Sequence, residues 1–238
     1  MKWGGLIPFS LSDFPGSLSA IAFTEGCNFR CAYCHNPGLM GNPGETAEQL
    51  ESGQNPRGAE KWTSLKILAF LKKRKGQLDG LVISGGEPTC QQKLVSFAAD
   101  VKKLGYRIKL DTNGSFPGVL DELISGRLVD YVAMDIKAPW HRYECVSGLP
   151  VDCSAIRRSV QILSGSDIPF EFRVTAVSPF ISREDLLTIG LEFGGLGPLF
   201  FQKFTRPEHI PVHEMATTAG LHEVSDYLGQ RFKSVRIR

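Results

Sequence analysis

The feature that most restricts the fold of this chain is a repeated alternation between short apolar runs and longer amphipathic stretches. The clearest helical stretch runs from Leu94 to Leu104, where apolar residues recur at helical spacing. The apolar runs predict strands at residues 18–24, 81–84, 107–110, 131–134, 170–177 and 198–204. Six successive strand-then-helix units imply parallel strands joined by right-handed crossovers. We therefore expect an α/β fold, an incomplete (β/α)6 barrel open on one side, because six units are too few to close an eight-stranded barrel.

Local signals mark several helix ends. A helix is expected to begin near Thr63 and to end in the basic run 72–75, whose cations complement the negative end of a helix dipole and need not indicate nucleic-acid binding. Pro117 is expected to open another helix. Ser182, with Asp185 three positions later, has capping-box spacing. The final residues, 235–238, predict a short edge strand.

Length and composition narrow the possible functions. The chain has 238 residues, with 27 basic and 25 acidic side chains and a net charge of +2, so no strong field points to nucleic acid or a membrane surface. No stretch approaches the length of a membrane helix, and residues 1–5 do not resemble a secretory signal. We expect one domain spanning residues 1–238 in the cytoplasm, where six cysteines favour metal binding or free thiols over disulfides. The polar stretch 38–60 is interpreted as a surface loop.

Three cysteines directly follow the first predicted strand. Cys27, Cys31 and Cys34 have the spacing C-x-x-x-C-x-x-C. A 4Fe–4S cluster normally has four thiolate ligands, so three would leave one iron open to another molecule. Two alternatives are a c-type haem on the C-x-x-C-H string and a zinc site with His35 as fourth ligand. The haem interpretation leaves Cys27 unused, and adjacent residues such as Cys34 and His35 seldom both reach one ion.

Other polar clusters follow the next three strands. In a parallel α/β fold these positions meet at the same rim, where ligands bind. Each cluster alone is also compatible with a simple turn or a structural ion pair. The clusters comprise Gly85, Gly86 and Glu87, then Asp111, Thr112 and Asn113, then Asp135 and Lys137. Arg173, halfway along the fifth strand, is expected to point either into the barrel or out to solvent.

The remaining cysteines and a histidine pair carry weaker signals. Cys145 and Cys153 are interpreted as unpaired structural thiols, and not as ligands of a second cluster or a disulfide, because they form no C-x-x-C motif. Cys90 is expected near the rim, where nothing in the sequence supports an accessory role. His209 and His213 have the spacing of one helix face, but the prolines around them favour a loop.

These motifs together resemble those of the radical S-adenosylmethionine (SAM) enzymes, an oxidoreductase superfamily. The resemblance rests on the cysteine spacing, on Gly-Gly-Glu after the second strand and on Asp-Thr-Asn-Gly after the third. More narrowly, the strings at residues 9–16, 34–37 and 134–139 are similar to those of the activating proteins of anaerobic ribonucleoside-triphosphate reductase, in the glycyl-radical enzyme activase branch. The likeness extends from about Phe9 to Phe204.

The resemblance implies that the three cysteines bind a 4Fe–4S cluster and that SAM chelates its open iron. It also implies that Tyr33 lies by the adenine, that residues 85–87 hold the methionyl amino group, and that Asp135 and Lys137 face the carboxylate. The candidate SAM contacts are Tyr33, Gly85, Gly86, Glu87, Asp111, Thr112, Asn113, Asp135, Lys137 and Arg173.

The implied reaction is one-electron cleavage of SAM to a 5′-deoxyadenosyl radical, which abstracts hydrogen from a backbone glycine of a partner enzyme. Anaerobic ribonucleotide reductase is the expected partner, and flavodoxin or ferredoxin is the expected kind of electron donor. One alternative is a radical SAM enzyme with a small-molecule substrate, similar to the 7-carboxy-7-deazaguanine synthases. The other is a non-catalytic zinc or haem module.

Overall fold

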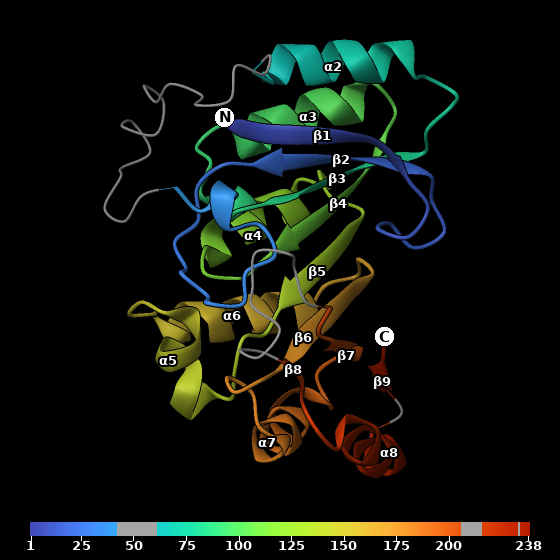
Figure 1. Ribbon diagram of the computed structural model, residues 1–238. Helices are drawn as coiled ribbons and strands as arrows, with labels where there is room; N and C mark the ends of the chain where they lie inside the picture. The colour runs from blue at the N-terminus through green and yellow to red at the C-terminus, as the bar shows by residue number, and fades with distance from the viewer. Residues whose placement is uncertain (42–60, 206–215, 233) are drawn as a thin grey trace.

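A nine-stranded, mostly parallel sheet runs through the molecule (Figure 1). The computed structural model describes residues 1–41, 61–205, 216–232 and 234–238. The main sheet has the order β1-β2-β3-β4-β5-β6-β7-β9, and β8 pairs with β6. The strands are β1 (Trp3–Ser10), β2 (Ser19–Thr24), β3 (Gly80–Gly85), β4 (Arg107–Thr112), β5 (Tyr131–Asp135), β6 (Phe170–Ser178), β7 (Leu199–Lys203), β8 (Ala216–Thr217) and β9 (Val235–Ile237).

Helices connect the parallel strands, and the predicted alternation is confirmed. From β2 to β7 each strand pairs in parallel with the next one in sequence. The helices are α2 (Ser64–Lys73), α3 (Leu94–Lys103), α4 (Pro117–Ser125), α5 (Tyr143–Ser147), α6 (Cys153–Ser164), α7 (Arg183–Phe193) and α8 (Leu221–Arg231), with short 3-10 turns η1 (Pro37–Leu39), η2 (Pro88–Cys90) and η3 (Trp140–Arg142).

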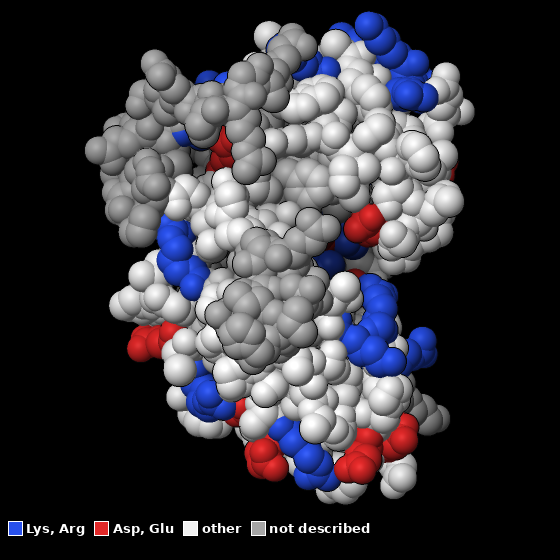
Figure 2. All heavy atoms as spheres, viewed as in Figure 1, with Lys and Arg blue, Asp and Glu red and all other residues white. Residues whose placement is uncertain are grey.

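The helix starts predicted from the sequence are confirmed. The Thr63 side chain caps α2, and Pro117 is the first residue of α4. Ser182 and Asp185 form the reciprocal capping box at the start of α7. Basic residues lie in the last turn of α2, before its end at Arg74, and Figure 2 shows basic atoms gathered over this end of the helix.

The sequence prediction missed two antiparallel strands. β1 pairs antiparallel with β2 at one end of the sheet, and β8 pairs antiparallel with the end of β6. The pattern of β1 is obscured by Gly4, Gly5 and Pro8, which a strand tolerates best at a sheet edge. Trp3 nevertheless anchors β1, because its ring packs 4.8 Å from that of Phe97.

The sheet does not close into a barrel. In the described part of the chain β1 and β9 are its two ends, and neither pairs with the other. The predicted open α/β architecture is therefore confirmed, with β1 as an added antiparallel edge. No helix among the described residues has the length and apolar character needed to cross a bilayer. His209, His213 and residues 42–60 lie outside the described residues.

Candidate active site

A cavity of about 340 Å³ opens at the carboxyl ends of the parallel strands. The segments that line it follow or end strands β2 to β7, as the shared rim predicts. Figure 2 shows a hollow in the surface at the level of β5, with basic and acidic atoms inside it. All of the predicted site residues line this cavity: Cys27, Cys31, Tyr33, Cys34, Gly85, Gly86, Glu87, Asp111, Thr112, Asn113, Asp135, Lys137 and Arg173.

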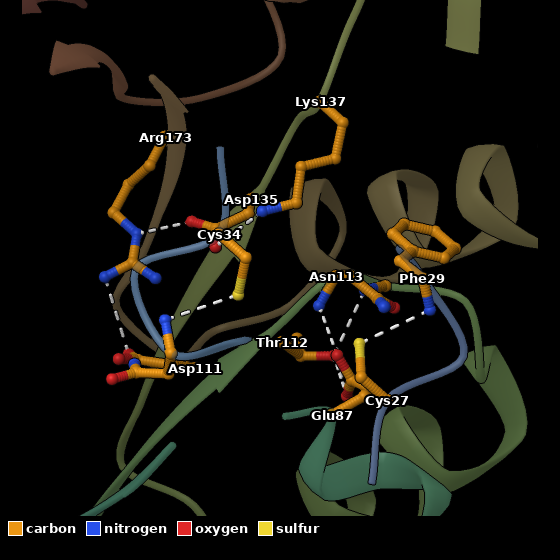
Figure 3. Close-up of polar contacts among 12 residues, drawn as sticks. Cys27, Phe29, Cys34, Glu87, Asp111, Thr112, Asn113, Asp135, Lys137 and Arg173 are labelled. Carbon is orange, nitrogen blue, oxygen red and sulfur yellow. Dashed lines mark hydrogen bonds and ion pairs between the residues drawn. The ribbon is translucent and has the colours of Figure 1, made fainter. Parts of the chain in front are cut away.

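Backbone amides donate to two of the three thiols in the loop after β2. The amide of Phe29 donates to Cys27 Sγ and the amide of Asn36 donates to Cys34 Sγ, both at 3.4 Å (Figure 3). Such bonds stabilise a thiolate, which is the form that binds iron. The loop therefore presents sulfur ligands that are already supplied with hydrogen bonds.

Alternate residues of the same loop are buried in the core. Phe29, Cys31 and Tyr33 are each less than a tenth exposed, and the Tyr33 ring lies 5.8 Å from that of Phe180. Burying these side chains fixes the loop, so that its cysteines face the cavity. Tyr33 is thus part of the core and of the cavity wall at once.

The glycines after β3 support the cysteine loop from the other side. The amide of Gly86 donates to the carbonyl of Thr24 at 2.9 Å, and that of Glu87 donates to the carbonyl of Gly26 at 2.8 Å. A Cβ on Gly86 would lie 2.1 Å from the Gly26 oxygen, and Gly85 has φ +117°. Both positions therefore require glycine, because the end of β3 packs directly on the chain that enters the cysteine loop.

The three thiols fit a metal cluster by the chemistry of their donor atoms. Burial, followed by the charge of Glu87, raises the pKa of Cys27 to about 12, and burial also raises the pKa of Cys31. Without a metal these side chains are neutral at physiological pH, whereas a bound metal deprotonates coordinating thiols. Three thiols lining one polar cavity are the donor set that a 4Fe–4S cluster with an open iron needs.

His35, the fourth ligand of the zinc alternative, is held to the chain through one of its two ring nitrogens. Its Nε2 lies 2.9 Å from the carbonyl of Thr205, and its ring lies 5.7 Å from that of Phe204. Within the described residues, no group of three or more His, Cys, Asp or Glu side chains is arranged around a single metal ion.

Glu87 joins the two neighbouring strand ends. Its side chain is 1% exposed. The carboxylate accepts bonds from the Thr89 amide at 3.0 Å, the Thr112 hydroxyl at 2.7 Å and the Asn113 amide at 2.6 Å, and also from the Thr89 hydroxyl. Burial raises the pKa of Glu87, and these hydrogen bonds oppose the rise. The carboxylate predicted to meet an amino group is thus also a structural hub between the segments after β3 and β4.

Asn28 was not predicted, and it links the cysteine loop to the turn after β4. Its Oδ1 accepts from Asn113 Nδ2 at 3.0 Å, and its Nδ2 donates to Ser115 Oγ at 2.9 Å. Asn113 Oδ1 in turn accepts from the amide of Ser115 at 3.0 Å. The Asn113 side chain therefore holds the cysteine loop, although a ligand contact was predicted for it.

Five charged side chains form a continuous chain across β4, β5 and β6. Arg173 joins the two carboxylates, with Nε 2.8 Å from Asp135 Oδ1 and Nη1 3.6 Å from Asp111 Oδ1 (Figure 3). A lysine lies at each end of this chain of charges. Lys109 Nζ is 2.5 Å from Asp111 Oδ1, and Lys137 Nζ is 3.2 Å from Asp135 Oδ2. Arg173 therefore points inward, which resolves the choice that the sequence left open.

This charge chain keeps Asp135 and Lys137 ionised. Burial alone would raise the pKa of Asp135, but the charges of Arg173 and Lys137 outweigh it and lower that pKa to about 2. Burial alone would lower the pKa of Lys137, but Asp135 raises it well above its ordinary value. The site thus offers fixed positive and negative charges to a zwitterionic ligand.

Three further cavity residues, Thr175, Gln202 and Lys203, were missed on the last strands. Thr175 follows Arg173 by two positions on β6, and Gln202 interrupts the apolar run of β7; both line the cavity. The two-residue period could have identified Thr175, because it puts Thr175 and Arg173 on one face of the strand. Among the other cysteines, Cys90 lies beside the site, 3.8 Å from Asn28 Oδ1.

Comparison with known proteins adds to this geometry. A family model described as the radical SAM superfamily matches residues 21–170. A Methanocaldococcus jannaschii protein with the provisional name of glycyl-radical enzyme activating enzyme is 32% identical over 187 residues, covering 76% of this chain and 71% of the relative. The pyruvate formate-lyase-activating enzyme of Clostridium pasteurianum is 30% identical, covering 58% and 53%. The 7-carboxy-7-deazaguanine synthase of Methanopyrus kandleri is 30% identical, covering 54% and 52%.

The chain spans about half the length of the last two relatives. Among solved structures, QueE from Escherichia coli superimposes with a TM-score of 0.57 at 14% identity, covering 99% of this chain and 92% of that protein. At this identity the similarity concerns the fold alone.

Proposed function

This chain belongs to the radical SAM superfamily, and on that premise we propose that Cys27, Cys31 and Cys34 hold a 4Fe–4S cluster whose fourth iron binds SAM. The observation that carries the proposal is that these thiols and every other predicted contact residue line one cavity. When bound, the cluster and SAM supply a 5′-deoxyadenosyl radical after one-electron reduction by an external donor, for which flavodoxin or ferredoxin is suitable.

The protein's own residues bind and orient the methionyl group. The carboxylate of Glu87, facing the cavity from its hydrogen-bonded hub, attracts the α-amino group. Lys137, held near the cysteines by Asp135, attracts the α-carboxylate. Asp111 and Thr112 supply the acceptors and the hydroxyl that ribose needs. Buried walls around these groups exclude water, which strengthens each electrostatic contact.

We further propose that the radical abstracts a hydrogen atom from a glycine α-carbon of a partner enzyme, with anaerobic ribonucleotide reductase as the expected partner. Two relatives that bear the names of activating enzymes support this class of reaction. The second candidate is a small-molecule radical reaction, because a 7-carboxy-7-deazaguanine synthase is also 30% identical to the chain.

Metal analysis after anaerobic reconstitution tests the cluster. We expect iron with acid-labile sulfide in the wild type and in Cys90→Ser, the matched control whose thiol lies beside the site. Cys27→Ser, Cys31→Ser and Cys34→Ser should each lose most of this iron. Stoichiometric zinc in place of iron and sulfide would contradict the assignment.

Product analysis tests the reaction. The reduced, cluster-loaded protein should convert SAM to methionine and 5′-deoxyadenosine. Addition of the co-expressed partner should then produce a glycine-centred radical signal by electron paramagnetic resonance. Deoxyadenosine without any glycyl signal would favour the small-molecule candidate.

A further inference from the structure

One wall of the cavity has no role in the proposed cofactor site. The predicted cluster and SAM contacts come from segments that follow β2 to β5, together with Arg173 on β6. Thr175 on β6 and Gln202 on β7 line the same cavity and belong to neither set, as does Lys203 at the end of β7. A substrate has to lie beside the cofactor, and this β6–β7 wall is a part of the cavity that the proposed cofactor contacts leave open to it.

Strand register shows that the two residues are neighbours. Thr175 pairs with Gln202 across β6 and β7 in the parallel ladder. Paired residues of adjacent strands present their side chains on the same face of a sheet. The hydroxyl and the primary amide therefore lie side by side.

The face that they share is the inner one. On β6, alternate residues Glu171 and Arg173 both point inward, since Arg173 lines the cavity and Glu171 is 1% exposed beneath it. The guanidinium of Arg238 binds Glu171 with two bonds of 2.9 Å and lies 4.3 Å from the ring of Phe200. Phe200 on β7 is thus inward too, and the residue two positions on, Gln202, shares its face.

Both side chains keep their hydrogen-bonding capacity. In the part of the chain that the structure describes, neither the Thr175 hydroxyl nor the Gln202 amide has a hydrogen-bond partner. Both residues are half-buried. Arg173, by contrast, is occupied by Asp111 and Asp135. The Thr175 hydroxyl and the Gln202 amide are neutral, and each offers a donor and an acceptor. The exposed ammonium group of Lys203 lies at the end of the same wall.

We propose that Thr175 and Gln202 form the substrate subsite and bind the main chain of an extended peptide segment that carries the reacting glycine. A peptide group presents one N–H and one C=O, which a side-by-side amide and hydroxyl can satisfy together. This inference rests on the proposed glycyl-radical function and names its recognition element. The peptide lies so that the glycine Cα–H bond breaks, its hydrogen joins C5′ of the deoxyadenosyl radical, and the unpaired electron remains on the glycine α-carbon.

The test uses a blocked peptide, acetyl-Ala-Ala-Ala-Gly-Ala-Ala-Ala-amide, with both glycine α-hydrogens replaced by deuterium. Three quantities are measured: 5′-deoxyadenosine formed without peptide, deuterium carried into 5′-deoxyadenosine with peptide, and binding of a fluorescein-labelled copy by anisotropy. The variants are Gln202→Ala and Thr175→Val. Gln161→Ala, an exposed glutamine on α6, is the matched control.

We expect all proteins to form deoxyadenosine without peptide at the wild-type rate. Gln202→Ala and Thr175→Val should each need about tenfold more peptide for half-maximal deuterium transfer and for half-maximal anisotropy, because each loses hydrogen bonds to the peptide. Gln161→Ala should match the wild type in all three measurements.

The outcomes separate the two levels of the proposal. If the wild type forms no deoxyadenosine, the proposed function fails, and anisotropy alone decides whether the wall binds peptide. If the wild type forms deoxyadenosine but neither binds the peptide at millimolar concentration nor takes deuterium from it, the subsite is not a peptide site. Equal behaviour of the variants and the wild type, or a parallel loss of deoxyadenosine formed without peptide, also overturns the assignment.

Discussion

Glu87 is the residue on which most hydrogen bonds of the site converge. Its carboxylate accepts from Thr89, Thr112 and Asn113 while being almost completely buried. Each of these partners donates a hydrogen bond to Glu87. The position is therefore satisfied only by a side chain that has two acceptor oxygens. A buried donor left without an acceptor costs free energy, and this makes the position sensitive to an otherwise conservative change.

Glu87→Gln should lower the free energy of unfolding by about 2 kcal/mol, because the new amide nitrogen would face the backbone amide of Asn113. Urea unfolding followed by circular dichroism measures this. The matched control is Glu122→Gln on the exposed side of α4, which should change stability by less than about 0.5 kcal/mol. Equal urea midpoints for Glu87→Gln and Glu122→Gln would contradict the role of Glu87 as a hydrogen-bond hub.

Arg173 controls the ionisation of Asp135. In Arg173→Gln the pKa of Asp135 should rise above its present value of about 2, because burial is then opposed by Lys137 alone. The carboxyl resonance of Asp135, followed by NMR during titration, reports this value. Lys103→Gln, which removes a surface ion pair with Asp100, should leave the Asp135 titration unchanged.

The sign of the linked stability follows from the lowered pKa. The ionised Asp135 stabilises the wild type above the unfolded-state pKa of about 4, and this stabilisation is lost as the pH falls toward 2. Arg173→Gln should therefore lose less stability between pH 4 and pH 2 than the wild type. A steeper loss in the variant would mean that Arg173 does not lower this pKa.

At the scale of elements, the end of β3 and the cysteine loop behave as one unit. Gly86 lies so close to Gly26 that a methyl group would overlap its carbonyl oxygen. Gly86→Ala should destabilise the protein by about 3 kcal/mol and reduce iron incorporation, because the loop would have to move. Gly118→Ala on α4 is the control, since nothing lies within 4 Å of its added methyl group and alanine favours helix. Thermal unfolding and iron analysis check both variants.

Elements with strong internal periodicity could be predicted from the sequence, and elements defined by distant contacts could not. The helix around Leu94 was predictable because its apolar spacing is a local property. β1 was not, because Gly4, Gly5 and Pro8 conceal a strand that exists through its pairing with β2. The low strand propensity of these residues is outweighed by the pairing of β1 with β2.

The same division applies to the site. The shared rim of the polar clusters follows from strand order, so their meeting at one cavity was predictable. The inward direction of Arg173 was not, because the sequence does not show which face of β6 is the inner one. The bonds of Asn28 to Asn113 and Ser115 join segments far apart in sequence, and no local pattern indicates them.

At the scale of the whole molecule, one sheet connects β1 to β9 without interruption, so the single predicted domain should unfold cooperatively. Trp3 reports on β1, and Trp140 in η3 reports on the part after β5. In Trp62→Phe/Trp140→Phe and in Trp3→Phe/Trp62→Phe, the fluorescence transition should coincide with that of circular dichroism. A separate fluorescence midpoint for either remaining tryptophan would indicate two domains.

Among the described residues, the outer edges of β1 and β9 are unpaired, which makes the sheet an open trough and not a closed tube. The interior of a closed barrel is filled with side chains, so its ligands reach it only from the loops beyond the carboxyl ends of the strands. A trough can receive the middle of a long polymer laid in sideways, with both flanks still attached to their own folded body. A catalyst of this shape can modify an interior residue of another macromolecule without that macromolecule first having to be cut or fully unravelled.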